Sequence, residues 1–242
     1  MKSLINLTKK LRKKYFYRNN NLKKSTLYSL IQHFEKVRKK EKIDVNGLNF
    51  LEFGTGINSA NMIHDCLDYY YNFDNPHTNK VVMFDHFKSD TDDESSNAVK
   101  IGLEEFKKSL SKRLETLNSN ESVRRYISET CEFRDGDIQI TSKDYLENNS
   151  FFGIISIDLG KYSFDSVFTV LDNLKEKLKS WTIIIFDDTA AFAGNPSKGA
   201  LGAINKFNNE NKNCGLSEIQ NLDNKYNNNK VYPELICYYW KN

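Results

Sequence analysis

The sequence predicts an α/β protein built on a doubly wound, mainly parallel sheet of seven strands. Short apolar runs rich in Ile, Val and Phe recur along the chain and alternate with longer stretches of helical periodicity. These runs are continuously apolar, which is typical of strands that helices cover on both faces. Only 11 Gly and 3 Pro interrupt the 242 residues, which argues against collagen-like and turn-dense all-β architectures.

The composition is that of a globular protein with a real core. Hydrophobic residues make up 39%, and the formal net charge of +3 is too small to indicate nucleic-acid binding by bulk electrostatics. The four cysteines are scattered without a CxxC pair, so we expect reduced thiols and neither a zinc site nor a disulfide framework. The basic start lacks the apolar core of a signal peptide, and no window approaches 18 apolar residues. We therefore expect a cytoplasmic protein without a membrane span, and both a monomer and a homodimer stay open.

Two helices are predicted between residues 3 and 42. Leucines recur at spacings of three and four before a break at 19–21, and a similar spacing returns after it. The first helix carries a cluster of lysines and one arginine, which we interpret as a solvated helix face.

A strand, a tight turn and a helix follow from residue 48. LNFLEF is an apolar run that ends in the glycines of FGTG, and Ala60, Ile63 and Leu67 behind it have helical spacing. The same pattern continues along the chain. It predicts strands at 80–85, 131–137, 151–158, 181–188, near 214–221 and at 234–240, and helices over 101–114, 142–148, 164–178 and 200–211. We expect the last strand to be antiparallel, forming an edge hairpin with the strand near 214–221.

Polar residues lie where the predicted parallel strands end, and ligands of such sheets bind at that edge. Gly54 and Gly56 let the backbone turn sharply toward a ligand, although Ser59 stands where a GxGxxG motif has its third glycine. Asp85 ends the second strand, where a carboxylate accepts ribose hydroxyls, with a helix cap or loop carboxylate as the alternative. Asp135, Gly136 and Asp137 form a polar cluster after the third strand, with an ordinary turn as the alternative. Together these residues outline a nucleoside pocket.

This order of residues resembles the class I S-adenosylmethionine-dependent methyltransferases over roughly residues 48 to 240. LEFGTG is similar to their first motif, which holds the methionine end of the cofactor, and Asp85 in VVMFDHF matches their ribose-binding acid. A dehydrogenase would continue with parallel units where this chain has ELICYYW. The resemblance implies cofactor binding by Glu52, Gly54, Thr55, Gly56, Ser59, Asp85, His86, Asp137 and Asp158. It divides the chain into a helical extension, 1–45, and a methyltransferase domain, 46–242.

A narrower resemblance is to the macrocin-type sugar O-methyltransferases. The matching positions are Asp158, Tyr162, Asp187, Asp188, Gly199 and Phe207. This resemblance implies a sugar hydroxyl as the acceptor and a metal site at the aspartates. The chain departs from the family at Gly160, where the family often has a second Asp. This chain therefore lacks one carboxylate that the family offers to the metal.

A physical argument for a metal stands beside this resemblance. Asp158 and Asp187 close strands that we expect to be neighbours, about 4.8 Å apart in a sheet, and Asp188 adds a third carboxylate. These acids repel one another unless a cation or proton intervenes, and hard oxygen ligands suit Mg²⁺. A metal would lower the pKa of a bound hydroxyl, and a nearby Asp or His86 would take its proton. The alternative is that these aspartates cap or hold loops.

We therefore expect an S-adenosylmethionine-dependent O-methyltransferase that acts on a sugar or on a surface-polysaccharide or glycan precursor. Its expected catalytic residues are Asp158, Asp187 and His86. Two other classes of protein stay open. One is a nicotinamide-dependent oxidoreductase, and the other is a methyltransferase-like binding module without turnover, which the missing Asp at Gly160 suggests. The acceptor loops of such folds vary too much for the sequence to name the acceptor.

Overall fold

The computed structural model describes most of the chain from residue 80 onward and short segments before it. The described residues are 36–37, 39–42, 49–54, 80–86, 102–115, 120–149, 152–160, 163–187, 189, 192–219 and 235–242. The predicted helices before residue 36, the helix predicted behind the first strand and the proposed domain boundary at 45/46 lie outside them.

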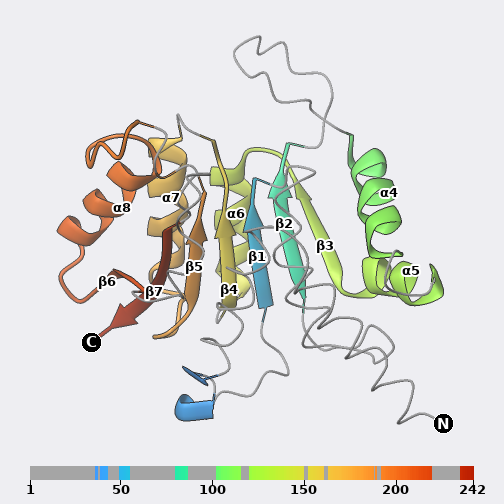
Figure 1. The fold of residues 1–242 in the computed structure, drawn as a ribbon, viewed down its shortest axis with the longest axis horizontal. Helices are drawn as coiled ribbons and strands as arrows, with labels where there is room; N and C mark the ends of the chain where they lie inside the picture. Colours follow the sequence, from blue (N-terminus) through green and yellow to red (C-terminus); the bar gives the residue numbers. More distant parts are fainter. Residues whose placement is uncertain are drawn as a thin grey trace.

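The described strands form one seven-stranded sheet in the order β3-β2-β1-β4-β5-β7-β6 (Figure 1). Their bounds are β1 Asn49–Phe53, β2 Val81–Asp85, β3 Cys131–Asp135, β4 Phe152–Ile157, β5 Ile183–Phe186, β6 Cys214–Glu218 and β7 Leu235–Lys241. Strands β1 to β5 pair in parallel, whereas β7 runs antiparallel to both β5 and β6. The predicted doubly wound sheet and its late antiparallel strand are confirmed.

Five helices are described alongside the sheet. Their bounds are α4 Leu103–Leu114, α5 Asn120–Glu129, α6 Ile138–Asn148, α7 Phe164–Leu174 and α8 Gly199–Glu210. The sequence did not predict α5, because its mainly polar segment offers few apolar residues, and Val123 and Tyr126 are the apolar side chains that it buries. Helix α7 ends at Leu174 rather than at the predicted residue 178, yet Leu178 is still buried.

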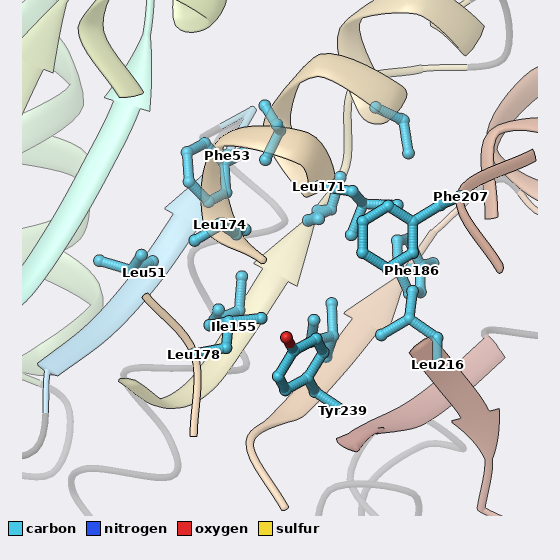
Figure 2. Packing of buried hydrophobic residues seen from close by; sticks show 14 of the residues in the cluster. Leu51, Phe53, Ile155, Leu171, Leu174, Leu178, Phe186, Phe207, Leu216 and Tyr239 are labelled. Carbon is cyan, nitrogen blue, oxygen red and sulfur yellow. The ribbon is translucent and has the colours of Figure 1, made fainter. Parts of the chain in front are cut away.

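The main core lies between the sheet and helices α6, α7 and α8. Figure 2 shows Leu51, Phe53 and Ile155 of the sheet facing Leu171 and Leu174 of α7. The opposite sheet face is also buried. Its members include Phe50, Val81, Met83, Ile154 and Ile183, each with an exposed fraction of 0%. This two-sided burial is why the strands are continuously apolar in sequence.

The edge strand β6 is closed by a side chain of α8. Asn208 accepts a hydrogen bond from the backbone N–H of Leu216 at 2.8 Å and donates one to its carbonyl at 2.9 Å. The amide thus occupies the backbone groups that an added strand would use. On the adjoining strand, the Trp240 ring lies against Gly215, where a β-carbon would be 2.7 Å from it.

None of the helices in the described part of the chain has both the length and the apolar character needed to cross a membrane.

Candidate functional site

The carboxyl end of β1 is packed tightly against the segment that follows β4. Gly54 has a φ of +81°, and a β-carbon added there would overlap the backbone carbonyl of Asp158. The backbone N–H of Asp158 donates to the carbonyl of Phe53 at 2.8 Å, and that of Gly54 donates to Phe84 at 3.0 Å. Only glycine meets both the left-handed conformation and the close approach. The strand end is therefore linked on both sides, to β2 and to β4.

Acidic residues end four of the parallel strands at this same edge. Asp85 is the last residue of β2 and lies in register with Asp135, the last residue of β3. Asp158 follows β4, and Asp187 follows β5 with its N–H donating to the carbonyl of Ile157 at 3.0 Å. The predicted adjacency of the strands that carry Asp158 and Asp187 is confirmed. The sequence placed Asp135 in the polar cluster after the third strand, but it did not predict the position of Asp135 beside Asp85, because that position depends on the β2–β3 register.

The loop after β2 begins with an interaction between two predicted site residues. The half-buried Asp85 accepts a hydrogen bond from the backbone N–H of His86 through Oδ1 at 2.6 Å. The His86 side chain is exposed. This bond fixes one carboxylate oxygen of Asp85 near its own backbone, and it leaves the imidazole at the edge of the sheet.

Asp137 has a structural role in this fold. Its Oδ1 accepts a hydrogen bond from the N–H of Gln139 at 2.8 Å, and its carbonyl accepts from the N–H of Thr141 at 2.8 Å. Asp137 is thus the N-cap of α6, which satisfies one of the unpaired N–H groups at the helix start. Asp137 thus belongs to the turn between β3 and α6, which was the alternative to a cofactor contact. The contact of Asp137 with a cofactor stays a prediction.

Glu52 lies inside the sheet rather than on its edge. Its exposed fraction is 0%, and it stands in register between Met83 of β2 and Ser156 of β4. Its negative charge adds to burial, the larger cause, in raising the pKa of the Cys131 thiol.

Gly160 begins the turn that leads into α7. Its φ is +77°, and a β-carbon there would meet nothing within 4 Å. Its carbonyl accepts hydrogen bonds from the backbone N–H of Ser163 at 3.3 Å and from the Ser163 hydroxyl at 2.5 Å. The backbone conformation therefore favours glycine here, whereas the space around it would accept a side chain.

An aromatic layer lies beneath the ends of β1 and β2. The rings of Phe53 and Phe84 stack at 4.6 Å, and Tyr145 of α6 meets Phe84 edge to face at 5.6 Å. The Arg134 guanidinium, which pairs with Glu132, lies 5.3 Å from the Tyr145 ring. Burial, with a smaller contribution from the Glu132 charge, raises the pKa of Tyr145 to about 12. This rigid layer supports the edge on which Gly54 and Asp85 stand.

Several predicted site residues lie outside the described part of the chain. They are Thr55, Gly56, Ser59, Tyr162 and Asp188. Two of the three proposed metal ligands, Asp158 and Asp187, are described. Among the described residues no group of three His, Cys, Asp or Glu side chains is arranged to hold a metal ion.

Comparison with known proteins gives matches among solved structures. No protein-family model and no curated protein sequence matches this chain. The O-methyltransferase NovP is 16% identical and superposes with a TM-score of 0.54 over 90% of this chain and 79% of its own. A candidate O-methyltransferase from Klebsiella pneumoniae is 12% identical, with a TM-score of 0.50 over 88% of this chain and 80% of its own. CalS11, a calicheamicin methyltransferase, is 16% identical over 96% of this chain and 91% of its own, with a TM-score of 0.49.

This chain has the class I methyltransferase fold. The strand order and the single antiparallel strand β7 agree with that result, and the predicted resemblance is confirmed at the level of the fold. In a class I methyltransferase fold, as in other open α/β sheets, the carboxyl edge of the parallel strands is the ligand-binding edge. Gly54, Asp85, Asp158 and Asp187 all lie there.

Proposed function

We propose that this protein is an S-adenosylmethionine-dependent O-methyltransferase that acts on a hydroxyl of a sugar or of a surface-polysaccharide or glycan precursor in the cytoplasm. The observation that carries the proposal is the packing of Gly54 against the backbone of Asp158. This packing brings the glycine at the end of β1, where the cofactor would bind, into contact with Asp158 after β4, where the hydroxyl acceptor would bind. The methyltransferase fold supports the same assignment.

The described residues fit the proposed cofactor. Gly54 lets the end of β1 pack against the backbone of Asp158 at the ligand-binding edge, and Asp85 ends the next strand, where a carboxylate binds ribose hydroxyls. Glu52 contributes negative charge below the site of the methionine end, and Thr55, Gly56 and Ser59 would complete this part. Asp137 would lie on the adenosine side while it caps α6. S-adenosylmethionine, when bound, supplies an electrophilic methyl group.

The acceptor half lies at Asp158 and Asp187. These residues follow neighbouring strands, so a sugar hydroxyl placed between them would be oriented by two acidic side chains. Either carboxylate, or the exposed imidazole of His86, would accept the hydroxyl proton as the oxygen attacks the methyl carbon. The bond between that carbon and sulfur would break, with S-adenosylhomocysteine as the leaving group. We further propose that Mg²⁺ binds Asp158, Asp187 and Asp188, where it would lower the pKa of the hydroxyl.

Cofactor binding is the direct test of this proposal. S-adenosylhomocysteine should raise the Tm of the protein, and NAD should not. Asp85→Ala should weaken S-adenosylhomocysteine binding at least about tenfold by calorimetry, because the ribose contact is lost. Asp172→Ala, which removes an exposed carboxylate on α7, is the matched control and should bind normally. Unchanged affinity in Asp85→Ala would show that the cofactor does not bind at this edge.

The two other classes make different predictions in the same experiments. A nicotinamide-dependent oxidoreductase would be stabilised by NAD, and the antiparallel β7 weighs against that fold. A binding module without turnover would bind S-adenosylhomocysteine yet transfer no labelled methyl group to any sugar offered. Transfer from labelled S-adenosylmethionine to a panel of sugars therefore decides between an enzyme and a module.

A further inference from the structure

The loop between β5 and α8 holds two side chains beside the acceptor half that the proposed function does not use. Phe192 is half-buried and Lys198 is exposed, and the Lys198 ammonium lies 5.8 Å from the centre of the Phe192 ring. The loop starts at Asp187 and ends where α8 begins at Gly199. In Figure 1 its described part lies at the end of the sheet to which β4 and β5 point. The described part of the loop and Asp187 therefore lie at the same end of the sheet.

The loop conformation is held in place by α8. Ala193 and Gly194 have φ values of 54° and 71°, as at the centre of a type I′ turn, and the N–H of Asn195 closes it by donating to the carbonyl of Phe192 at 3.1 Å. Asn205 of α8 donates to the carbonyl of Pro196 at 2.8 Å. The ring and the ammonium are thus presented on a fixed support, which lowers the entropic cost of binding a ligand.

The backbone of α8 approaches the loop closely. At Gly202 a β-carbon would lie 2.5 Å from the backbone of Ser197, so this glycine permits the contact. The Gly202 N–H donates to the carbonyl of Lys198 at 2.9 Å. Lys198 is exposed, and within the described segments its ammonium lies over the Phe192 ring rather than in an ion pair.

We propose that Phe192 and Lys198 determine acceptor specificity, and that they select a sugar that carries an anionic group away from the methylated hydroxyl. This inference rests on the proposed function. The aromatic ring would pack against the apolar face of the sugar, and the ammonium would pair with a phosphate or carboxylate. The anion would need this cation, because the edge beyond it carries the carboxylates of Asp158 and Asp187.

Calorimetric titrations with saturating S-adenosylhomocysteine test the assignment. Glucose 1-phosphate and glucuronate present the two anion types, while glucose and glucosamine provide the neutral and cationic comparisons. At least one anionic sugar should bind the wild type about five- to tenfold more tightly than glucose. Lys198→Ala should abolish that preference, and Lys198→Arg should keep most of it. Phe192→Leu should weaken the binding of all four sugars and leave the binding of inorganic phosphate unchanged.

Lys206→Ala is the matched control. Lys206 is an exposed lysine of α8 whose ammonium lies 4.0 Å from the Phe168 ring, so its loss should leave the preference intact. Equal or tighter binding of glucose or glucosamine to the wild type, or an unchanged preference in Lys198→Ala, would overturn the inference. S-adenosylhomocysteine affinity is measured in the same samples. If the wild type does not bind S-adenosylhomocysteine, the proposed function is refuted. If it binds S-adenosylhomocysteine but shows no preference for an anionic sugar, this inference alone is refuted.

Discussion

The carbonyl oxygen of Asp158 occupies the position that a side chain at Gly54 would need. The two residues are 104 positions apart in the chain, yet they meet because β1 and β4 are adjacent parallel strands. The cofactor half and the acceptor half of the proposed site therefore share one backbone contact. A substitution at Gly54 should therefore displace the backbone of Asp158, and a shift of Asp158 should displace Gly54.

Gly54→Ala should be strongly destabilising. The β-carbon would overlap Asp158, and the left-handed φ would add about 1–2 kcal/mol of strain. Gly160→Ala is the control, since it has a similar φ of +77° but open space around its β-carbon. Urea denaturation should give a loss of about 1–2 kcal/mol for Gly160→Ala and clearly more for Gly54→Ala. Equal losses would mean that the contact with Asp158 relaxes without cost.

Asp137 should separate capping from ligand binding. Asp137→Ala removes the acceptor for the Gln139 N–H and should lower the free energy of unfolding by about 1 kcal/mol. Asp137→Asn keeps an oxygen acceptor and should retain nearly all of that stability. If the carboxylate also contacts adenosine as proposed, Asp137→Asn should still weaken S-adenosylhomocysteine binding. Wild-type affinity in Asp137→Asn would leave this residue with the capping role alone.

Asp187→Asn tests the proposed metal. If Mg²⁺ binds there, the substitution should lower methyl transfer by at least about tenfold with little loss of stability, because removing one charge relieves repulsion among carboxylates. EDTA should abolish transfer in the wild type and leave S-adenosylhomocysteine affinity nearly unchanged. Asp172→Asn on α7 is the charge control. Full activity in EDTA together with wild-type turnover of Asp187→Asn would eliminate the metal and favour His86 as the base.

The buried Tyr145 should make stability fall at alkaline pH. Burial raises its pKa from 10 to about 12 in the folded protein. The unfolded chain therefore releases the phenol proton first, and stability declines as the pH rises from about 10 toward 12. Tyr145→Phe removes this component. Its free energy of unfolding should change less between pH 9 and about 11 than that of the wild type, and an identical slope would contradict the assignment.

The order of strands and helices was predictable from local patterns. The run at Ile183–Phe186 is continuously apolar because both of its faces are buried, and that signal is visible in the chain itself. Helix α5 escaped prediction because its segment is mainly polar and is held by packing of Val123 and Tyr126. Local propensity is a weak guide where tertiary contacts supply the stability.

The fold class, the seven strands and the acids and glycines at their ends could be predicted from the sequence, because period and turn chemistry are local properties. Which of those strand ends meet depends on the tertiary structure. The β2–β3 register sets Asp135 beside Asp85, and the packing of β1 on β4 presses Gly54 against Asp158. It also showed that Asp137 caps α6. These relationships depend on strand register and close packing between distant segments, which no local pattern encodes.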